Sequence, residues 1–219
     1  MSVTTTSHAY RRARRVFCLL GAFLGPAGCA SLGAPPQPRA LDATGLVRQD
    51  DGTLAWRAPQ WTPLRRLHID AEAVAFAPGV AIEPGQAQVL REALVQDLVL
   101  EAQAAGLGLA GPQEADVPRV RAVITGVTLA HPLLNAAATA LLIGAVSRGG
   151  LDVELEVVAP RQERLAALVF SGRSGLLNVV DGLSATGHAQ QQARYAAWRF
   201  ARLLAAAEGA GDAASGVRE

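Results

Sequence analysis

The chain has 219 residues, of which 50% are hydrophobic and 18% are charged. This balance excludes global disorder and predicts one domain of ordinary size with a substantial core. Residues 1–28 hold four of the 20 basic residues and none of the acidic ones, which leaves 16 basic and 19 acidic residues in the rest of the chain. A mildly acidic domain argues against a nucleic-acid partner, which requires a basic surface.

Residues 1–28 have the organisation of a secretory signal peptide. An arginine cluster is followed by an apolar run at 16–24 and then by the small residues Ala27 and Gly28. The run is too short to span a bilayer core of roughly 30 Å, because a helix rises only about 1.5 Å per residue. We therefore expect export and cleavage after Gly28. The arginine pair 14–15 also fits a twin-arginine motif, so the general secretory and twin-arginine routes both stay open.

Cys29 directly follows these small residues, and the segment resembles the lipobox of bacterial lipoproteins, in which such a cysteine is diacylated. Pro26 stands where that motif usually has an aliphatic residue, so an ordinary cleavage site beside an incidental cysteine is the alternative. Two or more acyl chains anchor a protein stably. Ala30, rather than aspartate, follows the cysteine. If sorting is as in enterobacteria, we expect an envelope protein on the inner leaflet of the outer membrane, facing the periplasm.

The rest of the chain divides into a linker, one domain and a tail. Residues 29–44 are rich in proline and small residues, which predicts an extended tether between the lipid and the domain. The domain is predicted at 45–207, and the small and charged residues at 208–219 predict a disordered tail. Cys18 belongs to the signal peptide, so the domain has no cysteine for a disulfide or a thiolate metal site.

The first half of the domain is predicted as a hairpin, a strand and a long helix. Asp51 and Gly52 lie between two β-like runs, as in a tight hairpin turn. Alternating apolar and polar residues at 67–73 predict a half-buried strand. Pro84 suits the first turn of a helix, which should continue to about Ala105 because leucines recur every fourth residue along it.

The second half of the domain is predicted as strands at 107–109, 120–129, 151–157 and 165–171, followed by an amphipathic helix at 190–207. The whole pattern predicts an α+β fold, in which helices pack on a mixed or mainly antiparallel sheet.

Several features in a fixed order resemble the family called domain of unknown function 3313. They are the hairpin with its central Asp-Gly, a Trp/Pro corner that consists of Trp56, Pro59, Trp61 and Pro63, the strand beginning LRRLHIDAEAV, the segment His131-Pro132-Leu133-Leu134-Asn135 and the C-terminal helix with Tyr195 and Trp198. The family has asparagine where this chain has His131. The resemblance covers about residues 45–205 and implies a bacterial, mostly proteobacterial, lipoprotein without an assigned activity. It assigns no functional residues.

The predicted domain lacks the residue patterns of common enzymes and metal sites. It has no cysteine nucleophile and no GxSxG serine motif, and His68, His131 and His188 lie far apart, outside any zinc motif. We therefore expect no catalytic residues, no metal ion and no cofactor.

Three carboxylates, Asp152, Glu154 and Glu156, share one face of a predicted strand, about 7 Å apart. Such a row could hold a cation or serve as acid and base in a hydrolase. We favour a solvated strand face that pairs with Arg119 and Arg121 of a neighbouring strand.

The segment 133–146 has no charged residue and is rich in alanine and leucine, but it is too short to span a bilayer. A core helix is the first interpretation. The alternative is a surface for self-association or for an envelope partner, because small residues permit close helix approach. The candidate interface residues are Leu133, Leu134, Leu141, Leu142 and Ile143.

A membrane anchor, a tether and the absence of catalytic motifs together favour a non-catalytic binding or assembly module for another envelope component. The alternative is a periplasmic-side carrier of a small ligand or lipid, with the apolar segment lining a cavity. A roomy pocket in the structure would favour the carrier, and a filled interface between sheet and helices would favour the binding module.

Overall fold

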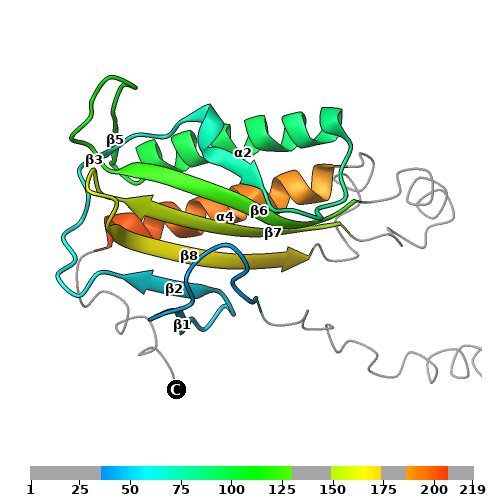
Figure 1. Cartoon of the computed structure of the whole chain (residues 1–219), viewed down its shortest axis with the longest axis horizontal. Coiled ribbons are helices and arrows are strands. Elements are labelled where there is room, and N and C mark those ends of the chain that lie inside the picture. The colour runs from blue at the N-terminus through cyan, green and yellow to red at the C-terminus, as the bar shows by residue number, and fades with distance from the viewer. Residues whose placement is uncertain (1–35, 130–148, 174–185, 207–219) are drawn as a thin grey trace, which may run out of the picture. The chain divides into compact units, whose positions relative to one another are not determined.

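The computed structural model describes residues 36–129, 149–173 and 186–206 (Figure 1). The predicted signal peptide and tail and the apolar segment 133–146 lie outside the described residues. The predicted site residues that lie there are Gly28, Cys29, Leu133, Leu134, Leu141, Leu142 and Ile143.

The strands of the described chain are β1 (Val47–Arg48), β2 (Leu54–Arg57), β3 (Arg66–Leu67), β4 (Val74–Phe76), β5 (Gly108–Leu109), β6 (Arg119–Thr128), β7 (Gly150–Val158) and β8 (Arg164–Arg173). Six of them form one sheet in the order β1-β2-β8-β7-β6-β4, and β3 pairs with β5 separately. Neighbours in the large sheet are antiparallel except β4 and β6, which are parallel. The predicted mixed, mainly antiparallel sheet is confirmed.

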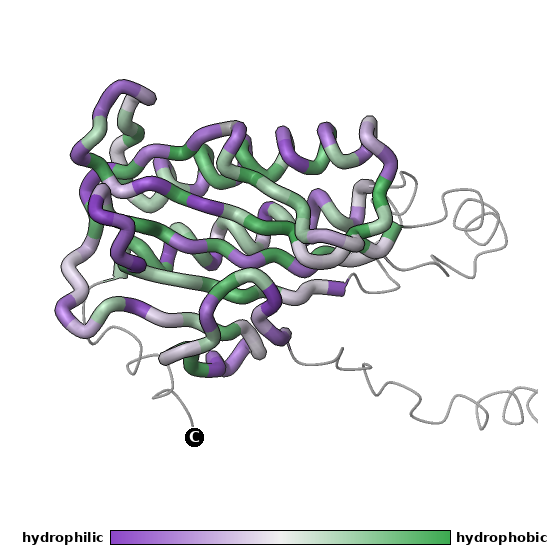
Figure 2. Tube along the Cα trace, in the orientation of Figure 1, coloured by the Kyte–Doolittle hydropathy of each residue, from purple (hydrophilic) through white to green (hydrophobic). Residues whose placement is uncertain are grey.

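Two α-helices, α2 (Pro84–Ala104) and α4 (Gly187–Ala205), pack against each other and cover one face of the large sheet (Figure 1). Hydrophobic and hydrophilic residues alternate along β6 and β7, so that each strand turns its apolar side toward the helices (Figure 2). The predicted helix 84–105 is confirmed. The C-terminal helix begins three residues earlier than predicted, because His188 and Ala189 are buried in the fold.

The interface between sheet and helices is closely packed where α2 and α4 meet the strands. Leu98 of α2, Phe200 of α4 and Val120 of β6 border a cavity of only about 10 Å³, which is at most the room that one water molecule needs. Alanines at the inner face of α4, such as Ala193 and Ala197, let its backbone approach its neighbours closely. The described interface is therefore filled at this place, whereas the segment 133–146, which would line the cavity of a carrier, lies outside the described residues.

The predicted strand at 67–73 is wrong in its second half. After β3 the chain forms a 3-10 turn at Ala71–Ala73 and then enters β4. The Asp70 side chain accepts a hydrogen bond of 3.0 Å from the backbone N–H of Glu72, which stabilises the turn. The local side-chain hydrogen bond thus outweighs the alternating pattern of residue types.

Residues 36–45, which we call the N-terminal strap, lie on the face of the large sheet opposite the two helices (Figure 1). Backbone N–H groups of Arg39 and Leu41 donate hydrogen bonds to Glu154 of β7. The predicted tether at 29–44 therefore extends too far, since residues 39–44 belong to the folded domain.

Candidate functional site

Helix α4 has one buried face and a second side that carries aromatic and arginine residues, which is unusual for a helix surface in contact with water. Tyr195, Trp198, Arg199 and Arg202 recur at i, i+3, i+4 and i+7, and therefore follow one side of the helix. We call these four residues the aromatic–arginine surface. Tyrosine, tryptophan and arginine are the residue types most enriched at the energetic centres of protein interfaces.

The aromatic rings of this surface form a continuous stack that reaches down to the sheet. The ring centroids of Tyr195 and Trp198 are 5.4 Å apart, and Tyr195 lies 5.7 Å from the buried ring of Phe170 in β8. These separations are typical of favourable aromatic pairs. Although Phe170 supports it from below, Tyr195 is still 42% exposed. The stack is thus rigid on one side and open to a partner on the other.

Two guanidinium groups lie over Trp198, Arg202 at 5.0 Å and Arg199 at 5.7 Å from the ring centroid. Both are close enough for a cation–π attraction. Arg199 also forms an ion pair of 2.6 Å with Asp51 in the hairpin turn. Within the described residues Arg202 forms no ion pair, and it is exposed.

A shallow pocket of about 300 Å³ adjoins the aromatic–arginine surface, between the β1–β2 hairpin and the end of α4. Arg57 lines this pocket, and Arg57 and Trp61 donate hydrogen bonds of 2.9 and 3.0 Å to the carbonyl oxygen of Ala206. They satisfy a carbonyl group that a helix end leaves without an intrahelical partner. The predicted Trp/Pro corner thereby holds the C-terminal end of α4 in place.

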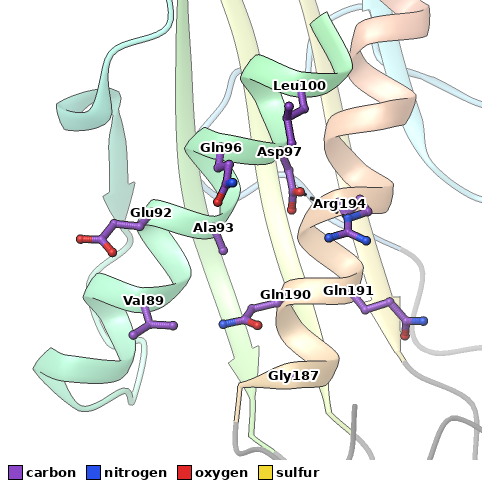
Figure 3. A pocket seen from close by; sticks show the side chains of 10 residues that line it. All are labelled: Val89, Glu92, Ala93, Gln96, Asp97, Leu100, Gly187, Gln190, Gln191 and Arg194. Carbon is purple, nitrogen blue, oxygen red and sulfur yellow. Dashed lines mark hydrogen bonds and ion pairs between the residues drawn. The ribbon is translucent and has the colours of Figure 1, made fainter. Parts of the chain in front are cut away.

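A second concave region of about 580 Å³ lies between the outer sides of α2 and α4 (Figure 3). Its lining is mainly polar, whereas most small-ligand pockets are lined by apolar residues. Asp97 of α2 and Arg194 of α4 face each other there, with 3.4 Å between Oδ1 and Nε. Burial raises the pKa of Asp97 above its ordinary value, and the nearby Arg194 opposes this shift.

The three carboxylates of β7 share one sheet face, as predicted, but their surroundings differ. Glu156 pairs with Arg121 at 3.7 Å, which confirms one of the two expected arginine partners. Arg119 instead donates a hydrogen bond of 3.4 Å to the carbonyl oxygen of Pro112. Glu154 is 0% exposed beneath the strap, so the expectation of a solvated strand face is wrong at its centre.

Asp152 is held by Arg173 at 2.8 Å and by the Ser171 hydroxyl at 2.5 Å. Burial raises the pKa of Asp152, but these two hydrogen-bond donors and the arginine charge lower it by more, so it lies below its ordinary value. A carboxyl group with a lowered pKa is a poor general acid at neutral pH.

The histidines of the described chain have structural surroundings. His68 is buried, with Nδ1 2.9 Å from the carbonyl oxygen of Ala110, and His188 is buried at the start of α4. His131 lies outside the described residues. Across 36–129, 149–173 and 186–206, no three histidine, cysteine, aspartate or glutamate side chains are grouped so that they could hold a metal ion. None of the helices in this part of the chain has the length and apolarity to cross a membrane.

The aromatic–arginine surface could not be recognised as a site from sequence alone. Tyr195 and Trp198 were notable only for their place in the family pattern, and arginine is the sole basic side-chain type besides histidine in this lysine-free chain. The signal that could have found the surface is the spacing of four such residues along one side of the predicted helix. The groove between α2 and α4 depends on helix pairing, which periodicity does not reveal.

Comparison with known proteins identifies a family. The family model described as "Protein of unknown function (DUF3313)" matches residues 43–200. No curated protein matches the chain.

Solved structures with a similar arrangement include a PelC dodecamer from Paraburkholderia phytofirmans, with a TM-score of 0.42 and 10% identity over 70% of this chain and 96% of that one. A PelC variant from the same organism gives 0.42 and 11%, over 70% and 98%. A minor lipoprotein from Acinetobacter baumannii gives 0.35 and 10%, over 64% and 92%. Similarities this weak are not informative about function. The family match, in contrast, spans most of the chain and agrees with the resemblance seen in the sequence, so the protein belongs to the family described as Protein of unknown function (DUF3313).

Proposed function

We propose that this protein is a lipid-anchored, non-catalytic envelope protein, and that its domain binds another envelope protein through the aromatic–arginine surface. The observation that carries the binding role is the pair of rings formed by exposed Tyr195 and half-buried Trp198, with the guanidinium group of Arg202 over Trp198. Such a preorganised group costs little conformational entropy on binding, because its side chains already support one another.

The anchor rests on the order of arginine cluster, apolar run and small residues before Cys29. Replacing the acylated sulfur removes the lipid and leaves the domain unchanged. We expect Cys29→Ser to move the protein from the envelope fraction to the soluble fraction and to abolish the incorporation of labelled palmitate. A variant that still fractionates with membranes as wild type does, or a wild type that never takes up palmitate, would refute the anchor.

The absence of catalysis is supported by the state of the β7 carboxylates. A hydrolase that uses a pair of carboxyl groups needs one with a raised pKa in a concave site. In β7, the pKa of Asp152 is lowered, Glu156 is paired with Arg121, and Glu154 is enclosed by backbone N–H groups. These surroundings are those of structural carboxylates.

Site-specific photo-crosslinking tests the binding role, since the chain has no lysine for amine-reactive reagents. We expect a benzophenone-bearing phenylalanine at Tyr195 to give a discrete adduct in intact cells. The same probe at Gln103, an exposed position of α2, should give none. Trp198→Ala should remove the adduct because it removes the neighbouring half of the stack. An adduct that persists in Trp198→Ala, or equal labelling from both positions, would exclude this surface.

The apolar segment 133–146 is a second candidate for association, with self-association as one outcome. Charged substitutions at Leu141 and Ile143 separate the two interpretations of it. If the segment is an interface, the variants stay folded, and a complex detected by sedimentation is lost. If the segment belongs to the core, the same substitutions unfold the domain, and an interface role for it is excluded.

A further inference from the structure

The strongest unexplained feature outside α4 is the buried carboxylate of Glu154. It is 0% exposed and accepts three hydrogen bonds from consecutive backbone N–H groups of the strap. The donors are Arg39 at 2.6 Å to Oε1, and Ala40 at 3.0 Å and Leu41 at 2.6 Å to Oε2. Successive backbone N–H groups that converge on one anion form a strong, geometrically specific binding arrangement.

The arrangement is conditional, because all three of these donors belong to the strap. A carboxylate in the middle of a sheet loses its hydration and is stabilised only when donors replace the water. Glu154 therefore favours the state in which residues 39–41 are seated on β7. In the same state the Arg39 guanidinium donates to the carbonyl oxygen of Thr125 at 3.2 Å, so the strap also binds β6.

A second set of contacts holds the other end of the strap. The Arg164 guanidinium donates hydrogen bonds of 2.6 and 2.7 Å to the carbonyl oxygens of Asp42 and Thr44. The same guanidinium lies 4.4 Å from the ring centroid of Trp56 in β2. The strap is thus held at two adjoining places, residues 39–41 and residues 42–44, by groups on three different strands.

We propose that the buried carboxylate of Glu154 holds the strap on the sheet, and that this contact, which we call the latch, sets the length of the flexible tether between Cys29 and the domain. The proposal rests on the proposed lipid anchor at Cys29. With the strap bound to the sheet, the tether from Cys29 to Arg39 spans at most about 35 Å. If the strap were released, a tether that continued to residue 45 would span at most about 55 Å.

Limited trypsin digestion of the full lipidated chain in membranes tests the latch. Cleavage after Arg39 requires release of the strap, whereas cleavage after Arg121, within β6, reports global unfolding. We expect Glu154→Gln to speed cleavage after Arg39 by tenfold or more with Arg121 still protected, because an amide cannot accept from three donors as a carboxylate does. The control is Glu163→Gln at an exposed position just before β8, which should behave as wild type.

Each outcome of the digestion decides the latch. Rapid cleavage after Arg39 in the wild type, or equal slow cleavage in wild type and Glu154→Gln, would overturn it. If Glu154→Gln also exposes Arg121, the substitution Arg164→Gln provides the test instead. It removes the hydrogen bonds to Asp42 and Thr44 without burying an unpaired charge. It must then accelerate cleavage after Arg39 alone. The same digestion of soluble Cys29→Ser protein shows whether the latch holds in the absence of an anchor, so the two proposals fail separately.

Discussion

At the scale of single residues, Asp97 and Asp152 show how the same side chain can have opposite effects on stability. Burial raises the pKa of Asp97, and the arginine paired with it, Arg194, has a side chain that is 73% exposed and therefore screened by water. Asp152 has donors that outweigh its burial, so its pKa is lowered. Linkage turns these directions into opposite pH dependences.

Asp152→Asn should destabilise the domain at pH 7. Because the folded-state pKa of Asp152 lies below its ordinary value of 3.8, its charge contributes stability that is present above about pH 3.8 and is lost as the pH falls through the folded pKa. Loss of the charge-assisted hydrogen bonds from Arg173 and Ser171 should cost about 1–2 kcal/mol. Thermal unfolding at pH 7 and pH 3 measures this, and the gap between variant and wild type should shrink at the lower pH.

Asp97→Asn should leave the melting temperature at pH 7 unchanged or higher. The raised pKa means that the charge of Asp97 opposes folding above its folded-state pKa, and that this cost disappears below the ordinary value of 3.8, where the group is protonated in both states. The same pair of melting curves at pH 7 and pH 3 provides the check. A loss of stability as large as that of Asp152→Asn would show that the pairing with Arg194 outweighs burial.

At the scale of elements, prediction from sequence succeeded where periodicity alone decides the structure. Helix α2 was located to within a residue because Pro84 and a leucine every fourth residue mark it, and β6, β7 and β8 follow from β-branched and alternating residues. The turn after β3 was missed because a single hydrogen bond from Asp70 sets it. The strap was missed because its partners are 113 to 115 residues away in the sequence.

The candidate site also has parts that the sequence predicts and parts that only tertiary contacts determine. The position of α4 and the presence of Tyr195 and Trp198 on it could be read from the sequence. That Phe170 supports Tyr195, and that Asp51 fixes Arg199, depends on how β8 and the hairpin meet the helix. Contacts between distant segments arise from tertiary packing, which local patterns do not encode.

Gly45, where the strap meets the β1–β2 hairpin, offers a test at this scale. Its φ of +78° lies in the left-handed region, and a Cβ there would stand 2.6 Å from the Trp56 ring. Gly52 has a similar φ of +83° with nothing within 4 Å of a Cβ. Gly52→Ala should cost about 1–2 kcal/mol, the penalty of the left-handed backbone. Gly45→Ala should cost more, because the ring or the strap must also move. Equal losses in thermal unfolding would show that the strap does not depend on this close approach.

At the scale of the whole molecule, the latch implies that the folded domain begins before residue 45. A chain that starts at residue 36 keeps the donors to Glu154, whereas one that starts at residue 45 lacks all three of them. The longer chain should be more stable by about 2–3 kcal/mol in urea denaturation, because hydrogen bonds to a charged group are worth about 1.5–3 kcal/mol and water replaces them in part in the shorter chain.

Glu154→Gln in both chains separates the latch from a general effect of length. In the longer chain it should destabilise the domain, because the amide presents a donor to the N–H group of Arg39 or Leu41. In the shorter chain it should have little effect or stabilise the domain, because the carboxylate there has lost its compensating donors. The interaction energy between strap and side chain is the difference between the two effects. If the substitution lowers the free energy of unfolding equally in both chains, Glu154 and the strap do not interact, and Glu154 does not hold the strap.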